Sequence, residues 1–225
     1  MSKNVVYSVI TNKYDSIWSI PPKSNYDGGG VHEPEEWDFI LFTNNDIKSE
    51  WNIKKINLID DNPIKTQRKF KICNDFIFNN YEKSIYVDGN MRMLEKPEHL
   101  WTLFGSDFTL MSHPFRSSIR AEQQAITTYK KDRPEITKSQ IEKYLSEGYV
   151  DNNLVQTGIL FRNHTEKVID FSRFWCKEVM RHSHRDQLSF NYSCWKKNFE
   201  YNTIPINSQK LYNDTNLFKL FRHAK

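Results

Sequence analysis

The sequence has few cysteines, and those it has stand apart. Cys73, Cys176 and Cys194 form no Cys-x-x-Cys pair and no Cys/His zinc pattern. Isolated thiols are typical of proteins in a reducing compartment. We therefore expect free cysteines, no disulfide framework and a cytoplasmic protein.

Long apolar runs are also missing. No stretch approaches the roughly 20 apolar residues of a membrane-spanning helix. The N-terminal stretch MSKNVVYSVITNKYDS has a short apolar run broken by polar residues, which does not fit a cleavable signal. We expect no transmembrane segment. The polar, aromatic and basic tail at 211–225 leaves room for a peripheral membrane or multidomain context.

The chain carries no block of like charge. Its net charge is +4 over 225 residues, and the basic residues are spread along the sequence. Binding to a nucleic acid backbone usually requires a denser basic patch, so we expect no nucleic acid partner. A small phosphorylated ligand fits this charge balance.

What is present is a globular composition with alternating strands and helices. Hydrophobic residues make up 38% and charged residues 27% of the chain. Expected strands are 4–11, 38–43, 51–59, 83–88, 107–114, 156–164 and 199–207. Expected helices are 68–80, 97–105, two within 118–148 that part near Pro134, 166–182 and 184–195. Continuous apolar strands between helices predict an α/β fold with a mostly parallel sheet, in a single domain at 1–225. A long polar loop is expected at 20–37.

One short stretch, "KSIYVDGNM", has two interpretations. Asp88-Gly89 is a strong signal for a two-residue turn, and the alternating residues after it would complete a hairpin. Alternatively, Asp88 and Asn90 lie at the carboxyl end of a buried strand, where α/β sheets bind ligands. Carboxylate and amide oxygens two residues apart could then bind a hard cation together with substrate phosphates. The residues alone leave both interpretations open.

A second stretch, "RHSHRDQLSF", opens a helix. Ser183 and Asp186 have the spacing of a capping box. In a functional interpretation Arg185 would neutralise a phosphate, Asp186 would act as base or charge stabiliser, and Gln187 would hold a sugar hydroxyl.

Polar residues follow several of the expected strands. Asp88, His113 and Arg162 each come just beyond an apolar run, with Arg116, Glu122 and His164 close behind. Parallel strands that end in polar groups predict one shared pocket.

The order of these segments resembles a known family. "YSVITNKYDSI", "FILFTNN", "RKFKI", "YVDGNM", "HPFR", "QTGILFRNH", "FWCKEV" and "HRDQLSF" follow one another between about residues 5 and 205. The series is similar to the glycosyltransferase-like family that includes plant proteins implicated in mucilage and cell-wall polysaccharide synthesis, with bacterial and viral relatives. The resemblance implies a GT-A-like, Rossmann-type sheet that binds a nucleotide sugar and a divalent cation, Mn²⁺ or Mg²⁺.

The resemblance also implies roles for particular residues. The donor would be bound by Thr11, Tyr14, Asp15, Arg68, Lys71, Asp88, Gly89 and Asn90. The sugar and the acceptor would be bound by His113, Arg116, Gln156, Thr157, Arg162, His164, Arg185 and Gln187. Asp88 and Asn90 would occupy the Asp-x-Asp position, with His223 as a late metal ligand. The chain departs from the family at Gln156, where relatives often have Glu, and at Asn90, which is not a carboxylate.

We therefore expect a metal-dependent glycosyltransferase of the hexosyl or deoxyhexosyl class. It would move a sugar from a nucleoside diphosphate sugar, UDP-linked in the first instance, to a hydroxyl of a glycan or glycoconjugate in polysaccharide biosynthesis. Asp186 is the first candidate catalytic carboxylate and Glu122 the second. The alternatives are a metal-dependent phosphoesterase or nucleotide hydrolase, which normally has more carboxylates around its metal, and a non-catalytic glycan-binding module.

Overall fold

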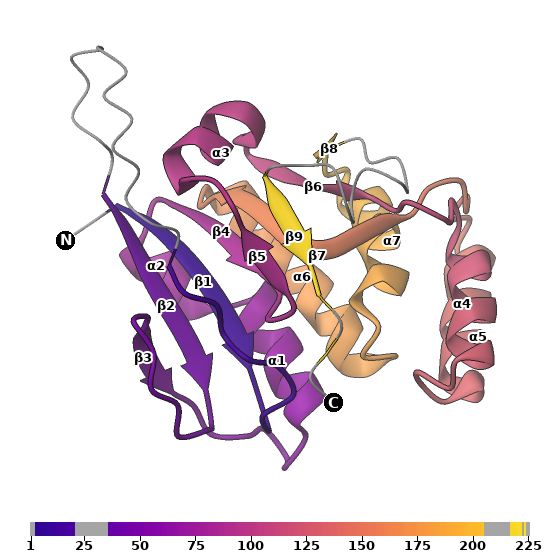
Figure 1. Cartoon of the computed structure of the whole chain (residues 1–225). Helices are drawn as coiled ribbons and strands as arrows, with labels where there is room; N and C mark the ends of the chain where they lie inside the picture. The colour runs from indigo at the N-terminus through magenta and orange to yellow at the C-terminus, as the bar shows by residue number, and fades with distance from the viewer. Residues whose placement is uncertain (1–2, 21–35, 205–216, 222, 224–225) are drawn as a thin grey trace.

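The computed structural model of the chain describes residues 3–20, 36–204, 217–221 and 223. Most of the loop expected at 20–37 lies outside these residues, as does the end of the strand expected at 199–207. The expected arrangement of strands and helices is otherwise present (Figure 1).

A seven-stranded sheet in the order β3-β2-β1-β4-β7-β6-β8 forms the centre of the molecule (Figure 1). Its strands are β1 (Asn4–Ile10), β2 (Trp37–Thr43), β3 (Asn52–Lys55), β4 (Lys83–Val87), β6 (Phe108–Ser112), β7 (Val155–Asn163) and β8 (Asn202–Ile204). Four neighbouring pairs are parallel. The two antiparallel pairs are both made by β7, with β4 and with β6. The prediction of a mostly parallel, Rossmann-type α/β sheet is confirmed.

Helices cover both faces of this sheet because its strands are apolar on both sides. All seven residues of β1 are buried, as expected for a central strand of a parallel sheet. The helices are α1 (Pro63–Ile72), α2 (Asp75–Asn80), α3 (Pro97–Phe104), α4 (Ile119–Thr128), α5 (Pro134–Ser146), α6 (Glu166–Arg181) and α7 (Asp186–Lys197). No helix in the described ranges combines the length and hydrophobicity needed to cross a membrane.

Two main cores flank the sheet, and a third lies beside it. On one face, Tyr7, Tyr86 and Leu160 pack against α1, α6 and α7. On the other, Ile85 and Phe161 pack against α3 and a small two-stranded ribbon (Figure 1). A third cluster holds α4 and α5 against α7. The first core is the layer that fixes α1, and α1 carries several of the candidate site residues.

The single helix expected at 68–80 is wrong, because the structure has two helices there. α1 begins earlier, at Pro63 behind the cap residue Asn62, whose side chain accepts from Lys65 N. The chain is extended at Cys73 and Asn74, and Asn74 then caps α2 by accepting from Ile77 N. The helical spacing of apolar residues in the sequence continues through this break, because both helices bury residues in the same core.

The hairpin of the first interpretation of Asp88-Gly89 does not form. A turn does close there, with Met91 N donating to Asp88 O at 2.9 Å. The chain then enters β5 (Met91–Met93), which pairs with β9 (Phe218–Leu220) near the C-terminus and not with β4. The tail aromatics Phe218 and Phe221 thus pack onto the rest of the fold.

Candidate functional site

Polar side chains gather at one edge of the sheet. β4 and β6 run in the same direction, because both pair antiparallel with β7. Asp88 follows β4, His113 follows β6, and Thr157 lies near the start of β7 at this same edge. The carboxyl edge of a doubly wound sheet is where its ligands bind. The expected convergence of Asp88 and His113 is therefore present.

A first group, the Asp88 cluster, consists of Arg68, Lys71, Asp88, Thr157 and Asp186. Lys71 Nζ lies 2.8 Å from Asp186 Oδ2 and 3.6 Å from Asp88 Oδ1. Thr157 donates to Asp186 Oδ2 at 3.0 Å and accepts from Lys71 at 3.2 Å. Arg68 Nε lies 3.8 Å from Asp186 Oδ1. Helix α1 thus presents two cations to two carboxylates at the end of the sheet.

Asp186 is buried and stays ionised. Burial opposes its charge, but the Arg68 guanidinium and the Lys71 ammonium outweigh burial and hold the pKa of this carboxyl well below its usual range. A carboxylate with a depressed pKa is a weak proton acceptor. The geometry therefore suits Asp186 to charge stabilisation better than to general base catalysis.

A second group, the Glu122 cluster, consists of His113, Arg116, Glu122, Arg185 and Gln187. Arg116 Nε donates to Glu122 Oε2 at 2.6 Å, and Arg185 donates to Glu122 Oε1 at 3.3 Å. Arg185 also donates to Gln187 Oε1, and Gln187 donates to Val155 O at the start of β7. Since Arg185 directly precedes Asp186, the two clusters form one continuous charged network.

His113 is neutral at physiological pH. Burial and the adjacent Arg116 lower the pKa of His113 to about 4. Its Nδ1 accepts from the backbone of Phe115 and Arg116, which fixes the loop after β6. Nearby, Gln156 Oε1 and Arg185 Nε are buried and have no hydrogen-bond partner in the described part of the chain.

The N- and C-terminal segments meet beside Asp88 in what we call the clasp: Asp15, Trp18, Asn90, Phe221 and His223. Phe221 N donates to Asn90 O at 2.8 Å, and Asn90 Nδ2 donates to Phe221 O at 3.2 Å. His223 Nδ1 lies 3.1 Å from both carboxylate oxygens of Asp15. Trp18 stacks on Phe221 with ring centroids 4.3 Å apart. The clasp fixes the turn that carries Asp88.

Of two other residues expected at the donor site, Tyr14 contacts the clasp and Thr11 binds the start of α1. Tyr14, half exposed, packs its ring against His223 at 4.7 Å between centroids. Thr11 instead donates to Pro63 O at 2.9 Å and ties the end of β1 to the start of α1.

Gly89 is required by a close approach in the clasp. A Cβ at this position would lie 2.9 Å from Asp15 Cβ and 3.0 Å from Ile10 Cδ1. We expect Gly89→Ala to displace the turn that carries Asp88, to lower the activity of this site at least tenfold and to cost about 1–3 kcal/mol of unfolding free energy. Initial rates and chemical denaturation test this.

The matched control is Gly148→Ala, where φ is +93° and nothing lies within 4 Å of the new Cβ. Backbone strain there should cost stability by roughly 1 kcal/mol without touching the rate per folded molecule. Equal rate losses in the two variants would contradict a local role for Gly89.

Arg162 and His164 do not join the site, and their expected place there is wrong. β7 runs antiparallel to β4, so its end lies at the opposite edge, with Arg162 paired to Ser84 at the start of β4. Arg162 is fully buried and donates to Ile72 O at 2.9 Å and to the hydroxyl of Tyr7. It takes up terminal carbonyls of α1 and so helps to end that helix at Ile72. His164 contacts Tyr81 O and Ser84 Oγ.

His164 makes stability depend on pH. Burial and the nearby Arg162 lower the pKa of His164 to about 4. Between about pH 6.5 and pH 4 the unfolded chain binds a proton here that the folded chain does not, so stability falls as the pH falls through this window. We expect His164→Gln to reduce the loss of unfolding free energy between pH 7 and pH 5 by up to about 2 kcal/mol. The exposed His99, changed to Gln, is the control and should leave the pH profile unchanged.

A divalent cation fits this edge only together with a substrate. No group of three or more His, Cys, Asp or Glu side chains within the described ranges could hold a metal ion by itself. Tyr86 donates to Asp88 Oδ1 at 2.5 Å, which leaves Oδ2 for a cation. The Asn90 amide nitrogen is committed to Phe221 O, so its oxygen is the atom that remains. Mg²⁺ commonly binds in this way, through one or two protein oxygens, substrate phosphates and water.

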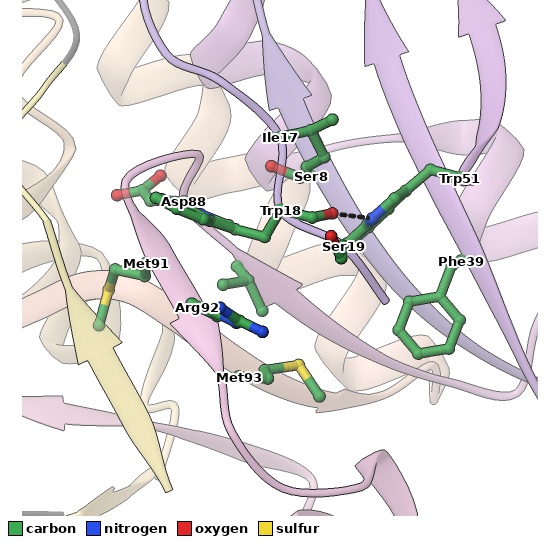
Figure 2. A pocket seen from close by; sticks show the side chains of 11 residues that line it. Ser8, Ile17, Trp18, Ser19, Phe39, Trp51, Asp88, Met91, Arg92 and Met93 are labelled. Carbon is green, nitrogen blue, oxygen red and sulfur yellow. Dashed lines mark hydrogen bonds between the residues drawn. The ribbon is translucent and has the colours of Figure 1, made fainter. Parts of the chain in front are cut away.

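A small pocket lies on the α3 side of the sheet, next to Asp88 (Figure 2). It is lined by Ser8, Ile17, Trp18, Ser19, Phe39, Trp51, Val87, Asp88, Met91, Arg92 and Met93. Trp51 Nε1 donates to Trp18 O at 2.7 Å across it. Figure 2 shows the Asp88 carboxylate at its rim, pointing away from Phe39 and Trp51. The space inside suits about one water molecule, so this pocket is too small to hold a nucleotide or a sugar.

Comparison with known families bears on this arrangement. The family TOD1/MUCI70, glycosyltransferase-like domain, matches residues 42–223. The chain belongs to this family. The resemblance seen in the order of sequence segments is thus confirmed, and the match contains Asp88, both clusters and most of the sheet. A glycosyltransferase-like family implies a transferase that takes a sugar donor and an acceptor. The comparison with curated proteins finds no match.

Within this family domain, two site residues escaped the sequence analysis. Gln67 Nε2 donates to the hydroxyl of Tyr86 at 2.7 Å, and Tyr86 in turn holds Asp88. Tyr86 looks like an ordinary core residue of an apolar strand, so no sequence signal identifies it.

The capping box expected from Ser183 to Asp186 at the start of α7 is wrong. Ser183 Oγ accepts from Arg185 N, and Arg185 is the cap residue of α7.

Proposed function

We propose that the chain is a GT-A-type glycosyltransferase that moves a sugar from a nucleoside diphosphate sugar, in the first instance a UDP-sugar, to a hydroxyl of a glycan. The observation that carries the proposal is the position of Asp88. It directly follows β4, a central strand of the Rossmann-type sheet, and it faces the Lys71 ammonium group of α1 at 3.6 Å while Tyr86 binds only one of its carboxylate oxygens. Membership of a glycosyltransferase-like family supports it.

In this proposal the Asp88 cluster receives the diphosphate of the donor. Asp88 Oδ2 and the Asn90 amide oxygen would hold Mn²⁺ or Mg²⁺, which supplies Lewis-acid stabilisation of the leaving diphosphate when it is bound. Arg68 is 16% exposed at its side chain and can add a charge-assisted hydrogen bond to a phosphate. Asp186, ionised and next to Lys71, stabilises positive charge that develops on the transferred sugar.

The Glu122 cluster would receive the transferred sugar and the acceptor. Arg116 and Arg185 are both held by Glu122, and each has a second partner, His113 for Arg116 and Gln187 for Arg185. The neighbouring Phe115 and Tyr129 are 60% and 67% exposed, which suits stacking on sugar rings. Glu122 itself pairs with both arginines, so we assign it to orienting them and not to proton transfer.

A thermal-shift panel with UDP, GDP, CDP and ADP, each with and without Mn²⁺, tests the proposal together with an assay of sugar release. Ligands that bind the folded state raise the melting temperature by mass action. We expect one nucleoside diphosphate to stabilise the chain with Mn²⁺, and its sugar conjugate to be consumed only when a glycan is present. Hydrolysis of the diphosphate without transfer would indicate a phosphoesterase. No shift with any nucleotide, with a shift on adding glycans, would indicate a binding module.

A further inference from the structure

Lys71 carries a buried positive charge directly beside the proposed metal site at Asp88. Its side chain is 1% exposed, and its ammonium group is surrounded by Asp186, Thr157 and Asp88 at 2.8, 3.2 and 3.6 Å. The ring of Tyr86 lies 5.1 Å from Nζ and closes the remaining side. Asp186 and Thr157 lie within hydrogen-bond distance of this ammonium group, and Asp88 is an ion-pair partner at a longer distance.

Because Lys71 is enclosed, it acts on Asp88 as a fixed charge. Asp186 and Thr157 share their hydrogen bonds with Lys71 and keep it in place. Asp88 is therefore already paired with Lys71 before any ion from solution binds. A divalent cation bound to Asp88 Oδ2 would be repelled by this ammonium group in a partly buried site, where charges are poorly screened.

We propose that Lys71 is the resident cation of the Asp88–Asp186 pair and makes divalent cation binding dependent on the diphosphate of the donor. Without a nucleotide, Lys71 keeps the affinity of Asp88 for Mn²⁺ or Mg²⁺ low. A bound diphosphate adds negative charge and further oxygen ligands, which offset the repulsion. The inference deepens the proposed function and rests on the cation placed there at Asp88.

The test is a titration of the free protein with Mn²⁺, followed by the electron paramagnetic resonance signal of unbound Mn²⁺. Lys71→Met removes the charge and keeps most of the volume, so two carboxylates face the site. We expect it to bind Mn²⁺ at least tenfold more tightly than the wild type without nucleotide. Adding UDP, or the nucleoside diphosphate that stabilises the chain most, should tighten Mn²⁺ binding mainly in the wild type. The difference in Mn²⁺ affinity between the wild type and Lys71→Met should then become smaller.

A second variant keeps the test valid if Lys71→Met does not fold. Lys71→Met combined with Asp186→Asn removes both members of the buried pair and leaves no unpaired charge between them. Asp88 then faces no ammonium group, and we expect Mn²⁺ affinity several-fold above the wild type. Circular dichroism confirms the fold of each variant.

Two results would overturn the inference: equal Mn²⁺ affinity in the wild type and the folded variants, or wild-type Mn²⁺ affinity that is as high without a nucleoside diphosphate as with one that the thermal shift shows to be bound. Neither readout requires sugar transfer. A wild type that binds no nucleoside diphosphate under any condition would instead count against the proposed function. The two failures are therefore distinguishable.

Discussion

Replacing Asp88 by asparagine is expected to lower kcat/KM for sugar transfer by at least about 10³-fold, equivalent to roughly 4 kcal/mol of transition-state stabilisation. The side chain is 27% exposed at the rim of the site, and an asparagine oxygen can still accept from Tyr86. What is lost is the negative charge that faces the cation and the diphosphate. Stability should change little, so initial rates and thermal unfolding measured on the same samples test the prediction.

Asp46→Asn is the matched control. Asp46 also pairs with a lysine, Lys55 at 2.5 Å, but its side chain is fully exposed. Exposed pairs of this kind contribute little, so both rate and stability should stay close to wild type. Retention of more than a tenth of the activity in Asp88→Asn would remove Asp88 from the centre of the mechanism.

Arg162→Met is expected to have the largest effect on stability, about 3–5 kcal/mol of unfolding free energy. The substitution leaves the Tyr7 hydroxyl and the Ile72 carbonyl without the buried donor that Arg162 supplies, whereas the Lys71 carbonyl keeps the Tyr7 hydroxyl as a donor. Chemical denaturation measures the loss. Nucleotide binding by the fraction that remains folded should persist, because Arg162 lies at the opposite edge of the sheet from Asp88.

The control for this variant is Arg173→Met. Arg173 is half exposed and pairs with Asp75 at 3.5 Å, so its loss should cost less than about 1 kcal/mol. If Arg162→Met were as stable as wild type but inactive, Arg162 would return to the sugar site where its sequence position first suggested it.

Sequence patterns predicted the elements well where burial decides the pattern. The run NVVYSVI predicted a buried strand, and the helical spacing of Val168, Phe171, Trp175 and Val179 predicted the helix that is α6 with its buried face. The same reasoning placed Asp88 at the end of a buried strand, which is where the structure has it. These predictions rest on local periodicity, which the sequence contains in full.

Local periodicity does not predict the direction in which a strand runs. An apolar strand reads alike in both directions, so β7 was taken to end beside Asp88 when in fact it begins there. For this reason the start of β7, with Thr157, joins the Asp88 cluster, whereas Arg162 and His164 at its end do not. The break of α1 at Ile72 has the same origin, since Arg162 comes from a distant segment to bind its carbonyls.

The sequence also did not predict the polar network around Asp88. Tyr86 and Gln67 act through contacts between β4 and α1, and neither belongs to a recognisable motif. The clasp joins Asp15 and Asn90 to residues more than 130 positions away. Contacts of this kind follow from tertiary packing and not from local pattern.

The most direct test of the central claim, that the carboxyl edge of the sheet binds a nucleoside diphosphate through Asp88, is a crystal structure with Mn²⁺ and UDP, or the diphosphate that stabilises the chain most. The account predicts an anomalous Mn²⁺ peak at bonding distance from Asp88 Oδ2, shared with the diphosphate, and phosphate oxygens within reach of Arg68. A nucleotide bound elsewhere, or a diphosphate at this edge with its cation away from Asp88, would contradict it.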